Sequence, residues 1–131
     1  MTFRNLEDEM GNPFVHVELN TTDVSKAKKF YGQLFAWQLE DVAMGPSGSY
    51  TMIKPGTGTG GGILRHPMPG EPSTWLAYVQ VEDIAAATEK AKALGAKIVR
   101  EVTEVPGVGS LSIISDPTGA TLGLWKPKTP S

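Results

Sequence analysis

The residues best suited to chemistry are a histidine and a glutamate two positions apart in residues 14–20, FVHVELN. Side chains alternate between the two faces of a β-strand, so His16 and Glu18 share one face and the apolar residues of the segment share the other. An imidazole and a carboxylate on one strand face can bind a ligand, hold a metal ion or move a proton. We interpret the pair first as polar side chains that line a ligand cavity.

A metal site is the second interpretation of the same pair. Transition metals take at least two or three His, Asp or Glu ligands, and the other histidine of the chain, His66, follows a glycine-rich stretch. A site built from His16, Glu18 and His66 is therefore one hypothesis. No spacing requires it, and we expect no metal and no other cofactor.

Proton transfer is the third interpretation. A part-apolar cavity raises the pKa of a carboxyl group, which would suit Glu18 as a general base. Tyr78 occupies the equivalent strand position in the second half of the chain, so the two side chains are expected to face one another. Glu18 and Tyr78 are thus the candidate catalytic residues, and a simple hydrogen-bonded polar pair is the structural alternative.

The elements that position these residues occur in the same order twice. In the first half, a strand at 14–20 precedes a helix that Asp23 caps, VSKAKKFYGQLF, and further strands at 37–42, 49–54 and 61–65. In the second half, a strand at 75–81 precedes a helix that Asp83 caps, IAAATEKAKAL, and strands at 96–102, 109–115 and 121–125. Apolar residues at helical spacing predict a buried stripe on each helix. The first stripe is Val24, Ala27, Phe30, Tyr31 and Leu34, and the second is Ile84, Ala87, Ala91 and Leu94.

A shift of about 60 residues superimposes the two halves. Asp23 falls on Asp83 and Leu34 on Leu94, and after a slip of one residue Gly62 falls on Gly123. Element type, caps and apolar stripes recur in the same order. The sequence therefore predicts an α+β fold of two tandem βαβββ modules, with a concave surface suited to a small molecule.

Three segments carry a resemblance to a known family: VHVELNTTDVSKAKKFYGQLFAW, WLAYVQVEDIAAATEKAKALGAKIV and EVPGVGSLSIISDPTGATLGLW. They resemble the vicinal oxygen chelate superfamily, which includes glyoxalase I, extradiol dioxygenases and bleomycin-resistance proteins, and most closely its glyoxalase-related branch. The resemblance implies a half-barrel fold. It also implies one domain over residues 13–127, with modules at about 13–66 and 74–127, an extension at 1–12 and a tail at 128–131.

The same resemblance implies where a divalent metal would bind. Enzymes of the superfamily use one position on the first strand and one on the last strand of each module. These positions correspond to His16, Leu76, Gly62 and Gly123, of which only His16 has a donor side chain. Glycine at both last-strand positions removes the carboxylates and enlarges the pocket. Trp125 shares the strand parity of Gly123, so we expect a ligand to contact His16, Glu18, Gly62, Tyr78, Gly123 and Trp125.

Composition limits the partners. The formal net charge of −2 gives no electrostatic reason to expect nucleic acid. No apolar run is long enough to cross a membrane, and the first residues are too polar for a signal peptide. The chain has no cysteine, which fits the cytoplasm. The resemblance and the exposed strand edges favour a homodimer.

The leading functional hypothesis is a glyoxalase-like, bleomycin-resistance-like protein that binds a small molecule without most of the usual metal ligands. It leaves the reaction unassigned, and does not decide whether the protein is an enzyme. The alternative is a metal-dependent lyase or dioxygenase with a relocated metal site. A pure interaction module is the third possibility, which the absence of a pocket would favour.

Overall fold

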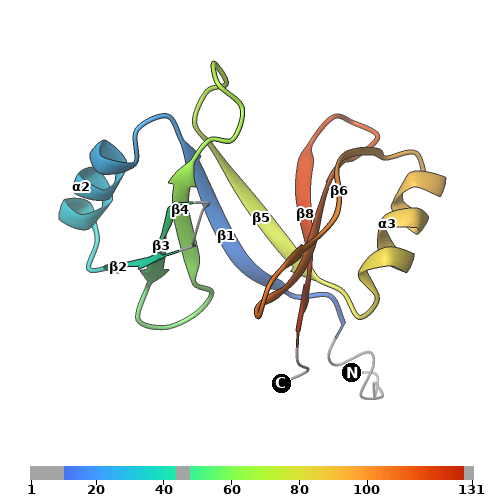
Figure 1. Ribbon diagram of the computed structural model, residues 1–131, viewed down its shortest axis with the longest axis horizontal. Helices are drawn as coiled ribbons and strands as arrows, with labels where there is room; N and C mark the ends of the chain where they lie inside the picture. The colour runs from blue at the N-terminus through green and yellow to red at the C-terminus, as the bar shows by residue number, and fades with distance from the viewer. Residues whose placement is uncertain (1–10, 44–47, 129–131) are drawn as a thin grey trace, which may run out of the picture. The chain divides into compact units, whose positions relative to one another are not determined.

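Residues 11–43 and 48–128 of the computed structural model are described here. The chain divides into two compact units. We call residues 15–77 the amino-terminal unit, and residues 78 onward, with those up to Phe14, the carboxyl-terminal unit. The division passes through the first strand of each βαβββ module, and each unit holds one helix (Figure 1).

The order of elements confirms the predicted α+β fold of two βαβββ modules. The first module contains β1 (Phe14–Thr21), α2 (Val24–Leu34), β2 (Gln38–Ala43), β3 (Ser49–Lys54) and β4 (Gly61–Arg65). The second contains β5 (Thr74–Gln80), α3 (Ile84–Ala93), β6 (Lys97–Val105), β7 (Gly109–Ser115) and β8 (Thr121–Pro127). Ends predicted from sequence differ mostly by one or two residues, and β6 is longer because it continues to pair with β7 as far as Val105.

The strands follow the same pattern in both modules. In the first module the order is β2-β3-β4-β1, and the first strand pairs in parallel with the last. In the second the order is β6-β7-β8-β5, again with the first strand parallel to the last. The register places Glu18 opposite Gly62 and Tyr78 opposite Gly123. The two halves thus place a polar side chain beside a glycine at equivalent points.

Both helices begin at the aspartates that the sequence predicts. The Asp23 carboxylate accepts a hydrogen bond from the Lys26 amide at 3.0 Å, and Asp83 accepts one from the Ala86 amide at 3.0 Å. An N-cap carboxylate satisfies amides that have no partner within the helix. Gly95 follows α3 with φ of 105°, a conformation that favours glycine.

Each unit has its own apolar core on the helix side of its strands. Leu19, Ile53 and Ile63 are buried in the amino-terminal unit, against Val24, Ala27 and Tyr31 among others. Ile84, Ile114 and Leu124 are buried in the carboxyl-terminal unit. Leu19 therefore faces α2, as strand parity predicts, whereas the side chains of His16 and Glu18 lie on the opposite face of the strand, away from α2.

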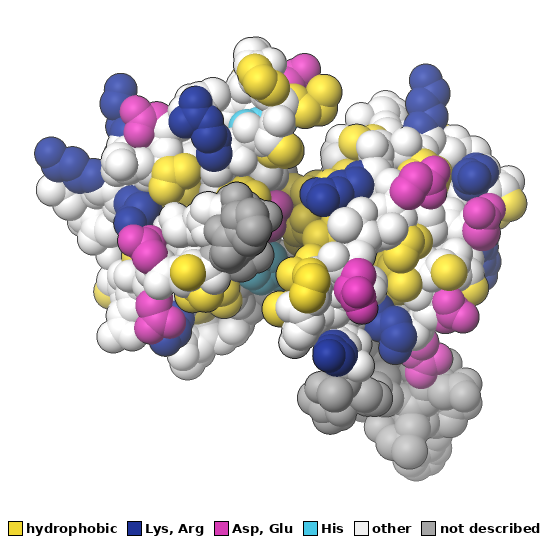
Figure 2. All heavy atoms as spheres, in the orientation of Figure 1, with side chains coloured by type: hydrophobic (Ala, Val, Ile, Leu, Met, Phe, Trp, Pro, Cys, Tyr) yellow, Lys and Arg dark blue, Asp and Glu magenta, His cyan; other side chains and the backbone are white. Residues whose placement is uncertain are grey.

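The predicted helix stripes are buried only in part. Val24, Ala27 and Tyr31 pack against the core, but Phe30 and Leu34 of the same stripe are exposed, as is Leu94 at the end of α3. Phe30 lies at the edge of the face that Val24, Ala27 and Tyr31 form, and Leu34 is the last residue of α2. Basic and acidic side chains are interspersed over the face shown in Figure 2. Across the described residues, none of the helices is long and apolar enough to cross a membrane.

Candidate functional site

Three polar side chains meet in the amino-terminal unit, on the face of the strands opposite α2. The Tyr50 hydroxyl lies 2.6 Å from the His16 Nε2 atom and donates a hydrogen bond to the Glu18 carboxylate at 3.2 Å. All three side chains are half-buried. The hydroxyl thus joins the imidazole and the carboxylate that sequence parity places on one strand face.

The strand register explains how Tyr50 reaches the pair. Glu18 lies opposite Gly62, and Gly62 lies opposite Met52, so these positions form one row across β1, β4 and β3. Tyr50 shares the face of Met52 because it is two residues earlier on β3. Its ring crosses Gly62, where a β-carbon would overlap the phenol. Glycine at position 62 is therefore required for Tyr50 to reach β1.

The geometry of this cluster bears on which of its groups carry protons. With the phenol proton directed to Glu18, the short contact to His16 is satisfied when the imidazole carries its proton on Nε2 and donates to the Tyr50 oxygen. Burial lowers the pKa of His16 below its ordinary value, because desolvation disfavours the charged imidazolium. The Tyr50 hydroxyl thus lies between a histidine whose neutral form is favoured and the Glu18 carboxylate.

The carboxyl-terminal unit repeats the relation of a tyrosine to a glycine. Tyr78 is buried, and a β-carbon at Gly123 would overlap its ring. The pairing of Tyr78 with Gly123 corresponds to that of Glu18 with Gly62. Trp125 is half-buried on β8, two residues after Gly123. Both last-strand positions that the family resemblance assigns to metal ligands are thus covered by a phenol ring.

A divalent metal does not fit these residues. Leu76, Gly62 and Gly123 offer no donor atom, and the Tyr50 ring occupies the space that a side chain at position 62 would need. The amide of His66 binds the carbonyl of Thr21 at the far end of β1, which is five residues or about 16 Å along the strand from His16. The His66 Nδ1 atom accepts from the Met68 amide. In residues 11–43 and 48–128, no group of three or more His, Cys, Asp and Glu side chains could hold a metal ion.

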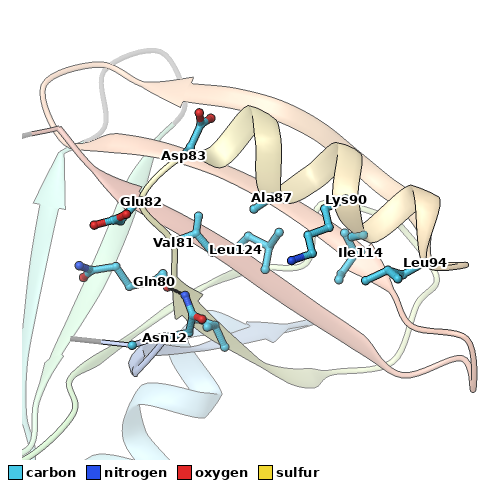
Figure 3. Close-up of a pocket in the computed structure, with 13 residues that line it drawn as sticks. Asn12, Gln80, Val81, Glu82, Asp83, Ala87, Lys90, Leu94, Ile114 and Leu124 are labelled. Atoms are coloured by element: carbon cyan, nitrogen blue, oxygen red, sulfur yellow. Dashed lines mark hydrogen bonds between the residues drawn. The ribbon is translucent and has the colours of Figure 1, made fainter. Parts of the chain in front are cut away.

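A groove of about 740 Å³ lies in the carboxyl-terminal unit, beside α3 (Figure 3). Ala87, Ala91 and Leu94 line it from the helix, and Leu124 and Ile114 line it from the sheet. The small alanine side chains leave this space open. None of the candidate site residues lines the groove. The Asp83 carboxylate in this groove caps α3, and the polar cluster predicted from the sequence lies elsewhere, so we place the candidate site at Tyr50.

The chain belongs to the glyoxalase/bleomycin resistance protein/dioxygenase superfamily, whose family model matches residues 14–124. CFP32 of Mycobacterium tuberculosis (strain CDC 1551 / Oshkosh), a protein provisionally named a glyoxylase, is 38% identical over 117 residues, covering 84% of this chain and 44% of CFP32. The anthracycline biosynthesis protein DnrV of Streptomyces peucetius is 24% identical over 123 residues, covering 83% of this chain and 45% of DnrV. This chain therefore spans less than half the length of these curated relatives.

Solved structures share the fold at low sequence identity. Protein BH1468 of Bacillus halodurans C-125 superposes with a TM-score of 0.67 at 16% identity, covering 92% of this chain and 97% of that one. Methylmalonyl-CoA epimerase from Mycobacterium tuberculosis superposes with a TM-score of 0.66 at 14% identity, covering 88% of each chain. These likenesses establish the glyoxalase-like fold of the two modules.

Tyr50 is the site residue that sequence reasoning misses. The segment SYTMIK is recognised as a strand, but which of its faces meets Glu18 depends on the pairing of β3 with β4. One signal was present, because Gly62 is a glycine within a strand, and such a glycine often marks the close approach of another group. To identify Tyr50 as the group that approaches Gly62, one needs the strand register, which brings Tyr50 to the same face as Gly62.

Proposed function

We propose that this protein binds a small organic molecule at the His16–Tyr50–Glu18 cluster and does so without a metal ion. The observation that carries the proposal is the Tyr50 hydroxyl, which bridges the imidazole and the carboxylate above a glycine. A few converging polar groups fix the orientation of a ligand in a small-molecule site, and this cluster offers an imidazole, a phenol and a carboxylate. The absence of cysteine supports the cytoplasm as its compartment.

The chemistry that this cluster supports is a proton transfer. In the proposed step the Glu18 carboxylate takes a proton from a carbon next to a carbonyl group. The electron pair of the broken C–H bond becomes that of an enolate, and the proton returns to carbon from Glu18. Tyr50 stabilises the carboxylate through its hydrogen bond, and His16 orients Tyr50. The step needs no other reactant, so it suits a site without a metal or redox cofactor.

In the carboxyl-terminal unit, taken by itself, Tyr78 and Trp125 are the residues that we propose for ligand binding. Both share the strand parity that places Glu18 and Gly62 on the site face of the first module. Tyr78 is buried over Gly123, which favours a role in shaping the surface rather than in transferring a proton. Trp125 is half-buried and offers a planar indole for an aromatic or planar ligand.

Native mass spectrometry of freshly purified protein tests the binding proposal. We expect a bound metabolite and no metal in the wild type, and loss of that metabolite in Glu18→Gln. Glu101→Gln, an exposed glutamate on β6, is the matched control and should keep the ligand. Equal ligand occupancy in the wild type and in Glu18→Gln would show that Glu18 lies outside the site.

Isotope exchange tests the proton transfer separately. The probe is methylmalonyl-CoA in D2O, chosen because a solved structure of the same fold is a methylmalonyl-CoA epimerase. We expect deuterium at the carbon between the carbonyl groups with the wild type, and a loss of about 100-fold or more in the exchange rate with Glu18→Gln. Exchange that is equal in both proteins would refute Glu18 as the base. No exchange with either protein, together with a bound metabolite, would indicate a ligand-binding protein without this activity.

A further inference from the structure

Asn20 is a buried polar residue whose side chain has no hydrogen-bond partner in residues 11–43 and 48–128. The residue is only 8% exposed, yet its amide bonds neither to the backbone nor to another side chain of those ranges. Buried polar side chains in proteins are normally hydrogen-bonded, because burial without a partner is unfavourable. The other buried polar side chains in the same part of the chain follow this rule: Thr21, Thr51, Thr88 and Ser112.

Strand parity places Asn20 on the site face, next to Glu18. It lies two residues after Glu18 on β1, about 6.6 Å along the strand, and Leu19 between them faces α2. The Tyr50 hydroxyl contacts His16 and Glu18 and so lies between those two side chains. Every fully buried side-chain nitrogen or oxygen of the described residues has a partner, so the unbonded amide of Asn20 still reaches solvent. A ligand on this face can therefore contact it.

The proposed proton transfer requires a hydrogen-bond donor at such a place. When the Glu18 carboxylate takes a proton from carbon, the electron pair of the C–H bond forms a C=C bond and the π pair of the carbonyl group moves to oxygen. The enolate oxygen then carries the negative charge that Glu18 has lost. Tyr50 directs its proton to Glu18, so it does not donate to this oxygen. The amide nitrogen of Asn20 offers two N–H groups.

We infer that the Asn20 amide donates a hydrogen bond to the carbonyl oxygen of the substrate and stabilises the enolate. The inference rests on the proposed function and adds to it a catalytic residue that binds the reacting group. A donor fixed on a strand favours the transition state over the ground state, because the negative charge on the oxygen grows during the step.

The same face defines the substrate class. Besides Asn20, β1 presents His16 and Glu18 there, and β4 presents Gly62 and Leu64. Over their described length, neither strand places a lysine or an arginine on this face. A carboxylate or phosphate bound at Asn20 would thus lie near Glu18 without a cation to balance its charge. The carbonyl group that Asn20 binds therefore belongs to a ketone, an aldehyde or a thioester.

NMR spectroscopy with 2-tetralone tests the contact. This probe is an uncharged ketone with an acidic C–H group next to its carbonyl group, and proton transfer in H2O leaves it unchanged. We expect the side-chain amide signals of Asn20, which Asn20→Asp identifies by their loss, to shift in a saturable way. The signals of Gln33, an exposed amide on α2, should not shift. No saturable shift of the Asn20 signals at millimolar 2-tetralone would overturn the inference, as would an equal shift of the Gln33 signals.

Deuterium uptake by 2-tetralone in D2O tests the catalytic role. We expect Asn20→Ala to lower kcat about 100-fold and to change KM by less than about threefold, because the hydrogen bond strengthens as charge forms on the oxygen. Asn20→Asp keeps the shape of the side chain without the donor and should lose activity as well. Gln33→Ala, the matched control on α2, should keep the wild-type rate.

Urea unfolding separates a catalytic from a structural role. Asn20→Ala removes no hydrogen bond between the described residues, so its midpoint should stay close to that of the wild type. A midpoint lowered as far as that of Leu19→Ala would make Asn20 a structural residue and overturn the inference.

Two further outcomes distinguish this inference from the proposed function. If the Asn20 signals shift but the wild type exchanges no deuterium, the proton transfer is refuted and Asn20 is kept as a residue that binds a carbonyl group. If exchange depends on Glu18 but is equal in the wild type, Asn20→Ala and Asn20→Asp, the proposed function is kept and the inference is overturned.

Discussion

The ring of Tyr50 lies across Gly62, in the space that any larger residue at position 62 would fill. This relation joins two features that appear separate in the sequence, a glycine in a strand and a tyrosine twelve positions before it. Because the ring crosses the glycine, its hydroxyl reaches His16 and Glu18 on β1. The site therefore depends on a residue without a side chain.

Gly62→Ala should displace Tyr50 without unfolding the protein. The β-carbon overlaps the far end of a side chain that can rotate away, so the cost is the loss of two hydrogen bonds, about 1–3 kcal/mol in total. Gly61→Ala is the comparison, because its β-carbon would meet the backbone carbonyl of Val17 and push β1 from β4. We expect it to cost about 3 kcal/mol or more in urea unfolding. A larger loss of stability in Gly62→Ala than in Gly61→Ala would contradict the position of the Tyr50 ring over Gly62.

Tyr50→Phe should leave the ring over Gly62 and remove only the hydroxyl. The stability loss should be about 1–3 kcal/mol, since two hydrogen bonds in a half-buried place disappear. Ligand occupancy or exchange rate should fall at least about tenfold, because Glu18 loses the group that orients it. Native mass spectrometry and isotope exchange measure these effects. An unchanged ligand affinity in Tyr50→Phe would remove Tyr50 from the site.

Glu18→Gln and Leu19→Ala should have opposite effects, although the residues are neighbours on β1. Glu18→Gln is expected to reduce ligand binding sharply and change the unfolding free energy by less than about 1 kcal/mol. Leu19 is buried against α2, so Leu19→Ala should cost about 2–5 kcal/mol and leave affinity in the folded fraction intact. If Glu18→Gln unfolds the protein while affinity is kept, Glu18 is a structural residue.

Elemental analysis should find no stoichiometric Zn, Ni, Fe or Mn in the purified protein. The positions that the family resemblance assigns to ligands are glycine or leucine except for His16, and an ion needs more donors than one imidazole. Glyoxalase I activity with methylglyoxal and glutathione should be absent as well. About one metal ion per chain, lost together in His16→Gln and Glu18→Gln, would establish the relocated metal site instead.

Stability should fall as the pH drops below the ordinary pKa of histidine, about 6.5. The pKa of His16 is lower in the folded protein than in the unfolded chain, so the unfolded chain takes up the proton first. The contribution of neutral His16 to the free energy of unfolding is therefore complete above pH 6.5, and it is lost as the pH falls toward the pKa of His16 in the folded protein. Urea unfolding at several pH values should show this slope in the wild type and in His66→Gln. The slope should be smaller in His16→Gln, and an equal slope there would contradict the burial of His16.

The amino-acid sequence by itself determined much of this protein. Strand alternation placed His16 and Glu18 on one face and Leu19 on the other, and caps and glycines fixed where both helices begin and where α3 ends. These features depend on neighbours within a few residues, so local patterns suffice to predict them. The internal repeat predicted the same caps and element order for the second module, and so the βαβββ order of both.

Only the tertiary structure decided which distant residues meet. The partner of His16 and Glu18 in the amino-terminal unit is Tyr50, because β3 pairs with β4 in one particular register and a shift by one residue would turn the phenol to the other face. The parallel pairing of β4 with β1 separates His66 from His16, since it places His66 beside the opposite end of β1. The exposure of Phe30 and Leu34 could not be read from the helical pattern either, because periodicity gives the direction of a stripe but not which of its members the core covers.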